Sequence, residues 1–143
     1  MINKLAFIGG SGLYEIEDFD SIEKINIETP WGYPSEDIVK INFNNKELYF
    51  LSRHGKGHKI SPTNINYRAN ICALKMLGVT DIISISAVGS LKENLHPKTF
   101  VIVDQYIDLT HHRIKTFFDS NIVAHVSMAK PTCKGLMNAC EHV

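Results

Sequence analysis

The sequence has little cysteine, and the three that it has are not arranged for a structural or metal site. Cys72, Cys133 and Cys140 form no Cys-x-x-Cys pair, and their number is odd. This argues against a disulfide framework and against a zinc centre, and it fits reduced thiols in a cytosol. We therefore expect no metal in this protein.

The chain also lacks long hydrophobic runs and net charge. The first apolar run, residues 5–8, is shorter than the core of a signal peptide, and no later run approaches the roughly 20 residues of a membrane span. Lys plus Arg number 15, as do Asp plus Glu, so no overall field favours nucleic acid or an anionic membrane. We expect a cytoplasmic protein without a membrane or nucleic-acid partner, in which any anion site is local.

The strongest chemical signal is the segment 51–58, LSRHGKGH. An arginine, a lysine and two histidines lie within six residues at the end of an apolar run, and Gly55 and Gly57 leave the backbone free to bend. Arg53 offers a planar fork of donors that suits phosphate, and His54 adds a further donor. The segment predicts an anion-binding loop, with a solvated basic loop at a strand end as the alternative.

Two further turns rich in small residues follow apolar runs. Residues 9–12 (GGSG) follow the first run, and residues 87–90 (AVGS) close the run 82–86. Three such turns at strand ends predict a ligand crevice along one edge of an α/β sheet. The first turn is not a dinucleotide fingerprint, because Glu15 occupies the third glycine position, which disfavours a dinucleotide oxidoreductase.

Apolar periodicity predicts the elements of this sheet. Strands are expected over residues 5–8, 23–28, 37–43, 47–52, 81–86 and 100–103, the last continued by 104–108. Asn44 and Asn45 have the chemistry of a tight hairpin, so the early part of the sheet should be mixed and not all parallel. With 143 residues, of which 44% are hydrophobic, the chain has the size of one domain or part of one.

Two helices are expected between and after these strands. The first is predicted to begin at the cap residues 61–64, to end at Gly78, and to complete a parallel crossover between two strands. Most of its polar residues Asn66, Tyr67, Arg68 and Asn70 are expected on a solvated or interface-facing side. A second helical pattern begins after Pro131 and is still running at Val143.

Six segments, taken together and in order, carry a resemblance to a known family. They are residues 8–13 (IGGSGL), 29–32 (TPWG), 53–55 (RHG), 66–71 (NYRANI), 86–91 (SAVGSL) and 104–108 (DQYID). The chain resembles the trimeric purine nucleoside phosphorylases, and within them the methylthioadenosine phosphorylases. The resemblance implies a phosphorylase-like α/β fold, with a mixed twisted sheet flanked by helices.

The resemblance implies phosphorolysis of a purine nucleoside, with S-methyl-5'-thioadenosine and phosphate giving adenine and 5-methylthioribose 1-phosphate. By the same match, phosphate is bound by Ser11, Arg53, His54, Ser86 and the backbone of Ala87. Ala87 also borders the nucleoside. Inorganic phosphate is a co-substrate, and no cofactor or metal is implied.

The resemblance also implies a homotrimer, in which His125 reaches the active site of a neighbouring subunit. Family members continue well beyond this length, and their further half carries the ribose-contacting methionine and the acidic residue that handles the purine. We therefore interpret residues 1–143 as the truncated N-terminal part of a single nucleoside phosphorylase domain, with no catalytic residue assigned and with doubtful activity of its own. The alternatives are a methylthioinosine, inosine or guanosine phosphorylase, or a non-catalytic module that binds phosphate or a nucleotide.

Overall fold

The computed structural model of the protein describes residues 4–10 and 22–142. The chain divides into two compact units, residues 1–87 (unit 1) and 88–143 (unit 2). Among the described residues, unit 1 contains a five-stranded sheet and unit 2 contains one helix. The predicted phosphate-binding residues Arg53, His54, Ser86 and Ala87 all belong to unit 1.

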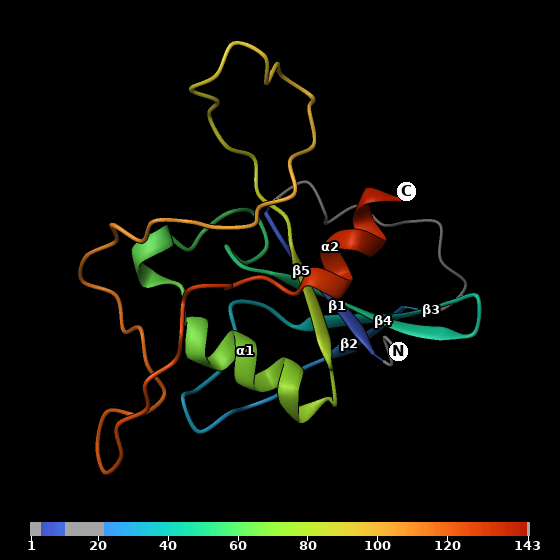
Figure 1. The fold of residues 1–143 in the computed structure, drawn as a ribbon. Coiled ribbons are helices and arrows are strands. Elements are labelled where there is room, and N and C mark those ends of the chain that lie inside the picture. Colours follow the sequence, from blue (N-terminus) through green and yellow to red (C-terminus); the bar gives the residue numbers. More distant parts are fainter. Residues whose placement is uncertain (1–3, 11–21, 143) are drawn as a thin grey trace. The chain divides into compact units, whose positions relative to one another are not determined.

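The sheet of unit 1 is mixed, as predicted (Figure 1). Its strands are β1 (Leu5–Gly9), β2 (Ile22–Ile25), β3 (Ile38–Phe43), β4 (Lys46–Ser52) and β5 (Asp81–Ser84). Their order across the sheet is β2-β3-β4-β1-β5. β3 is antiparallel to both β2 and β4, whereas β1 lies parallel to β4 on one side and to β5 on the other.

The predicted hairpin connects β3 and β4. Phe43 pairs with Lys46, so Asn44 and Asn45 form a two-residue turn. Both asparagines have positive φ, 49° and 60°, which is the geometry of the turn that matches the twist of an antiparallel pair. Asparagine tolerates this left-handed backbone better than most residues do, and this explains its use at both positions.

The predicted crossover is also present. Helix α1 (Tyr67–Met76) connects β4 to β5, which flank β1 and run in the same direction. The helix ends as expected, because Gly78 has φ 79° and its N–H donates to Lys75, while the N–H of Val79 donates to Leu74. This pair of bonds is the Schellman arrangement, in which glycine takes the left-handed position.

The start of α1 lies later than the sequence predicts. Pro62–Asn64 form a separate 3₁₀ turn, η2, and the Ser61 side chain makes no capping bond. The helix is capped instead by Asn66, whose side chain accepts the N–H of Ala69 at 3.1 Å. Several candidate cap residues follow one another here, and the chain uses the last of them.

The core of unit 1 lies between α1 and the sheet. Ala73 and Leu74 of the helix are fully buried against a cluster of strand residues and Val79. The strand members of this cluster are Ala6, Ile8, Ile38, Tyr49 and Leu51. Ile8 and Leu51 immediately precede the ends of β1 and β4, so the core fixes the points at which two of the predicted ligand loops leave the sheet.

Asn70 does not lie on the solvated or interface-facing side that we expect for most polar residues of this helix. Asn70 is 3% exposed, and its side chain forms two hydrogen bonds with Ser35: its Oδ1 accepts the backbone N–H at 2.7 Å, and its Nδ2 donates to Oγ at 3.0 Å. Asn66 likewise donates from Nδ2 to the carbonyl of Trp31 at 2.6 Å. The two asparagines therefore fasten the loop that precedes β3 onto α1, a role that an amide can fill where an aliphatic side chain cannot.

Unit 2 differs most from the sequence prediction. The strand expected over residues 100–103 and 104–108 is wrong, since neither segment is a strand in this structure. The apolar pattern is there, but a strand forms only where its backbone pairs with a neighbour, and Phe100 is 94% exposed. The helix expected after Pro131 is confirmed as α2 (Lys134–Glu141).

Unit 2 also exposes many large apolar side chains. Those exposed over more than three quarters of their surface are Val88, Leu91, Phe100, Ile107, Leu109, Val123 and Val126. A soluble protein exposes single apolar residues routinely, but a series of this size is more than such a protein usually shows.

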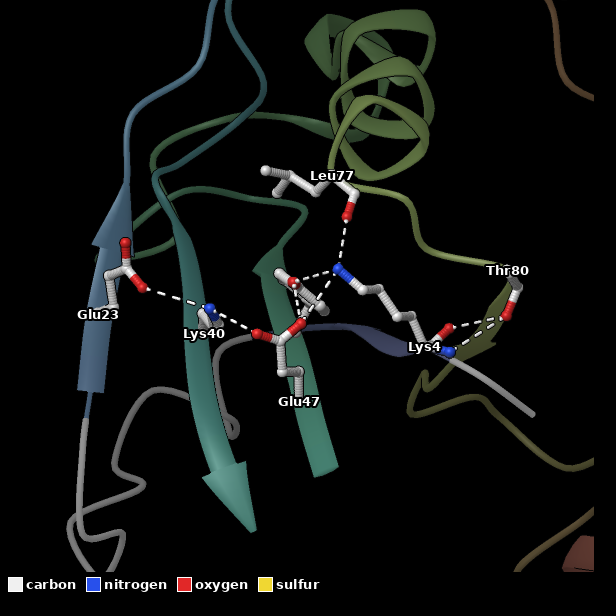
Figure 2. A network of polar contacts seen from close by, with 7 residues as sticks. Lys4, Glu23, Lys40, Glu47, Leu77 and Thr80 are labelled. Carbon is white, nitrogen blue, oxygen red and sulfur yellow. Dashed lines mark hydrogen bonds and ion pairs between the residues drawn. The ribbon is translucent and has the colours of Figure 1, made fainter. Parts of the chain in front are cut away.

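A network of charges joins the residue that precedes β1 to β3 and β4 (Figure 2). The two carboxylate oxygens of Glu47 lie 3.1 Å from Nζ of Lys4 and 2.7 Å from Nζ of Lys40. Hydrogen bonds from Lys40, Lys4 and Tyr49, in decreasing order of effect, lower the pKa of Glu47 to about 2. Lys4 Nζ also lies 3.4 Å from the carbonyl of Leu77, so the network reaches the end of α1.

This network predicts a loss of stability in acid. Because the pKa of Glu47 in the folded protein is about 2, below its ordinary value, the network contributes fully above pH 4.5 or so and is lost as the pH falls towards 2. Between these two pH values the Tm of Glu47→Gln should fall less than that of wild type. The difference should be only about a few degrees, because the ion pairs are partly solvated. Thermal unfolding followed by circular dichroism measures the effect, with the exposed Glu93→Gln as control. Equal slopes in wild type and Glu47→Gln would show that the network does not stabilise the fold.

Candidate functional site

Three loops leave the sheet at the same edge. β4, β1 and β5 are parallel, so their carboxyl ends lie together, and this is the edge at which open α/β sheets bind ligands (Figure 1). Two backbone bonds continue the ladder just beyond the strands: Arg53 N–H donates to Gly9 at 3.1 Å, and Ile85 N–H donates to Ile8 at 2.8 Å. The first residues of the three loops are therefore held side by side.

The side chain of Arg53 reaches all three strand ends. Its Nη1 donates to the carbonyl of Ile85, after β5, at 2.7 Å. Its Nη2 lies 3.5 Å from the point where a Cβ on Gly10, after β1, would sit. Its Nε donates to Nε2 of His54, beside it in the loop after β4, at 3.1 Å. One planar cation thus lies across the edge of the sheet.

His54 is buried under this guanidinium. It is 7% exposed, and its Nδ1 lies 2.9 Å from the carbonyl of Ile60. The ring of His58 stacks on it, with 4.2 Å between centroids and an interplanar angle of 22°. The imidazole is therefore fixed on both its edges and on one face.

The loop after β4 curls back on itself and uses its own backbone donors. Gly55 and Gly57 have φ of 68° and 75°, and a Cβ on Gly55 would lie 3.1 Å from the carbonyl of Ser35. The N–H groups of Gly55, His58 and Ile60 donate within the loop or to Ser52, and the N–H of Lys56 donates to the Glu36 carboxylate at 2.7 Å. These four N–H groups are therefore already paired within the protein.

The structure places the other predicted site residues as follows. Ser86 and Ala87 are exposed and directly follow Ile85, the residue whose carbonyl holds Arg53. Ser11 and Glu15 lie outside the described residues. His125 is exposed in unit 2. The structure thus brings Arg53 and His54 together with the chain that leads into Ser86.

Sequence reasoning missed the part played by Ile85. Its contribution is a main-chain carbonyl, which any residue carries, so no side-chain pattern could indicate it. Among the described residues no group of three or more His, Cys, Asp or Glu side chains is placed to hold a metal. In the same part of the chain, no helix has the length and apolarity to cross a membrane.

A family model for the phosphorylase superfamily matches residues 4–143. The chain belongs to the phosphorylase superfamily. Its resemblance to this family, read from six short segments, is therefore confirmed over nearly its whole length. Within the superfamily, the chain is 51% identical to the S-methyl-5'-thioadenosine phosphorylase of Cereibacter sphaeroides, over 98% of this chain and 48% of that protein. It is 53% identical to the protein of the same name from Hyperthermus butylicus, over 92% of this chain and 48% of that one.

Solved phosphorylase structures confirm the fold. A methylthioadenosine phosphorylase from an antarctic soil metagenomic library superposes with a TM-score of 0.90 at 51% identity, covering 94% of this chain and 47% of that one. The methylthioadenosine phosphorylase of Schistosoma mansoni, solved in complex with adenine, gives a TM-score of 0.88 at 40% identity, covering 97% and 53%. The chain thus spans about half the length of the relatives that it matches.

Proposed function

We propose that residues 1–143 are the N-terminal part of one nucleoside phosphorylase domain, acting in purine salvage as a pentosyltransferase. The whole enzyme transfers the methylthioribosyl group of S-methyl-5'-thioadenosine to phosphate, releasing adenine and forming 5-methylthioribose 1-phosphate. The observation that carries this proposal is the Arg53 guanidinium lying across three strand ends. The names of relatives about half identical to the chain support the choice of substrate.

In this proposal, Arg53 is the main ligand of phosphate. Phosphate carries close to two negative charges at neutral pH, and a guanidinium fork binds two of its oxygens at once. The hydroxyls of Ser11 and Ser86 and the backbone N–H of Ala87 complete the site, with His54 next to Arg53. The dianion held below the sugar acts as the nucleophile and stabilises the positive charge that develops on an oxocarbenium-like ribose.

Two residues of the chain are proposed to contact the nucleoside as well. Ala87 borders the nucleoside, and His125 reaches into the site of a neighbouring subunit in a cytoplasmic homotrimer. The match of these residues to the family motifs supports this arrangement. Sedimentation of a fully active monomer would contradict it.

A chimera tests the proposed reaction. Residues 1–143 are joined to the second half of the Cereibacter sphaeroides relative, and adenine release from S-methyl-5'-thioadenosine is measured with and without phosphate. Release that requires phosphate, or arsenate in its place, supports the proposal. Release that is independent of phosphate would indicate hydrolysis, and phosphate binding without release, in a chimera shown to be folded, would indicate a non-catalytic module.

A further inference from the structure

We propose that Glu36 is a positioning residue for the phosphate site, because its carboxylate holds the basic loop, residues 53–58, in the shape that presents Arg53 and His54. The observation behind this proposal is a bond in which Oε2 of Glu36 accepts the backbone N–H of Lys56 at 2.7 Å. The inference deepens the proposed function and rests on it, since it concerns how the loop with the phosphate-binding side chains is held.

The basic loop has a backbone shape that needs contacts to select it. Gly55, Gly57 and His58 have φ of 68°, 75° and 57°. Glycine permits this left-handed geometry but permits many others equally well, and histidine adopts it only at some cost. Bonds inside the loop, such as that from the His58 N–H to the carbonyl of Gly55, fix part of the shape. The N–H of Lys56 is bonded from outside the loop, by Glu36.

The segment before β3 meets the basic loop at two successive residues. A Cβ on Gly55 would lie 3.1 Å from the carbonyl oxygen of Ser35, so the two backbones approach closely there. Glu36 then binds the N–H of Lys56, the next residue along the loop. The turn of the basic loop therefore lies against residues 35 and 36.

Residues 35 and 36 are themselves fixed to the core of unit 1. The Ser35 backbone N–H and Oγ are both bonded to the side chain of Asn70, which is buried in α1. Ile38, two residues after Glu36, begins β3 and is fully buried. Glu36 is thus held between a helix contact and a buried strand residue, and it passes this fixed position on to the loop.

The consequence for an anion is a loop that is shaped before the anion arrives. A segment ordered in advance loses less conformational freedom on binding, so the anion binds more tightly. The charge of Glu36 acts in the opposite sense, because a carboxylate repels an anion nearby. The bond to Lys56 and the charge of Glu36 consequently have opposite effects on phosphate binding, and substitutions can separate them.

Glu36→Gln and Glu36→Ala make this separation. Glutamine keeps an oxygen that can accept the N–H of Lys56 but removes the charge, whereas alanine removes both. Asp37→Ala is the matched control, because it removes a neighbouring carboxylate that is bonded to the side chain of Asn26 instead. Equal Tm values across the set show that any difference is local.

Kinetics of the chimera give the first readout. Glu36→Ala should raise the KM for phosphate about three- to tenfold, because the lost bond is partly solvated. The KM for the nucleoside and the kcat at saturating phosphate should stay within about twofold, whereas a loss of folded protein would lower the apparent kcat and leave both KM values unchanged. Glu36→Gln and Asp37→Ala should keep a phosphate KM at or below about twice the wild-type value. An unchanged phosphate KM in Glu36→Ala, or the same change in Glu36→Gln and Glu36→Ala, would overturn the proposal.

Hydrogen exchange of the 143-residue chain, followed by nuclear magnetic resonance without phosphate, gives the second readout. The Lys56 N–H should exchange at least about threefold faster in Glu36→Ala and within about twofold of wild type in Glu36→Gln. The N–H of Val79, which donates to Leu74 at the end of α1, should be unchanged in every variant.

The two proposals fail in different ways. A chimera that neither binds nor uses phosphate would overturn the proposed function. Unchanged exchange of Lys56 in Glu36→Ala would overturn the positioning of the loop by Glu36, whatever the chimera does, because that measurement involves no phosphate.

Discussion

Arg53→Ala in the chimera is expected to lower kcat/KM for phosphate by about 10- to 150-fold. This range corresponds to the loss of one charge-assisted hydrogen bond, roughly 1.5–3 kcal/mol. The phosphate KM should rise because the fork is lost. The kcat should fall as well, because the same interaction holds the nucleophile in line with the sugar.

Arg53→Lys and Lys56→Ala make this experiment specific. Lysine restores the charge without the planar fork and without two separate anchoring bonds, so it should recover only part of the loss. Lys56 belongs to the same loop, and its side chain is exposed, so its removal tests whether general positive charge is enough. Wild-type kinetics for Arg53→Ala, or an equal loss for Lys56→Ala, would show that the phosphate site is misplaced.

Part of any loss in Arg53→Ala is structural and has to be measured separately. The substitution leaves Nε2 of His54 and the carbonyl of Ile85 without the donor that each has now. Thermal unfolding of the same variants gives this contribution. A kinetic effect that Arg53→Lys recovers only in part, with an unchanged Tm across the set, would assign the effect to binding of the anion by the fork.

The second large effect concerns residues 1–143 on their own, which are expected to release no measurable adenine from S-methyl-5'-thioadenosine. By the resemblance, the acidic group that handles the purine belongs to the further half of the family's proteins, so without it the base would leave as a poor anion. Proton transfer of this kind is typically worth about 100- to 10,000-fold in rate. By the resemblance, the ribose contacts also belong to the further half of the family's proteins, and this chain covers only 48% of a relative such as that of Cereibacter sphaeroides.

The exposed apolar side chains of unit 2 add a physical test to this prediction. If the second half of the protein covers them, adding that half of the relative as a separate chain should restore activity and reduce binding of a hydrophobic dye. Both changes should depend on the concentration of the added half. Robust turnover by residues 1–143 alone would contradict the prediction, and so would dye binding that the added half leaves unchanged.

The sequence predicted the parts of the fold that depend on local chemistry. Asn44 and Asn45 specify their turn, and Gly78 specifies the end of α1, because each needs a backbone conformation that few residues accept. The mixed sheet followed from that hairpin together with the crossover. The strand expected over 100–108 failed because strand formation depends on a partner as well as on the apolar pattern.

The sequence predicted which loops meet at the candidate site, but not the contacts that hold them together. The basic loop and the small-residue turns indicated one edge of the sheet, and Arg53 does reach the chain after β5. That contact is made to a backbone carbonyl, and the buried pairing of Asn70 with Ser35 depends on residues far apart in the sequence. Neither is encoded in a short pattern, because each follows from the packing of the whole unit.

The position of β1 inside the sheet, between β4 and β5, has a consequence for how the protein folds during synthesis. β1 is the first of the described strands to be made, yet its neighbours are β4, Lys46–Ser52, and β5, Asp81–Ser84. The β3–β4 hairpin can form from local contacts as soon as it is made, whereas the parallel pairs have to wait for distant segments and therefore form slowly. The end of the sheet that carries Arg53 therefore cannot be completed before Asp81–Ser84 has been synthesised, and until then β1 lacks its β5 neighbour.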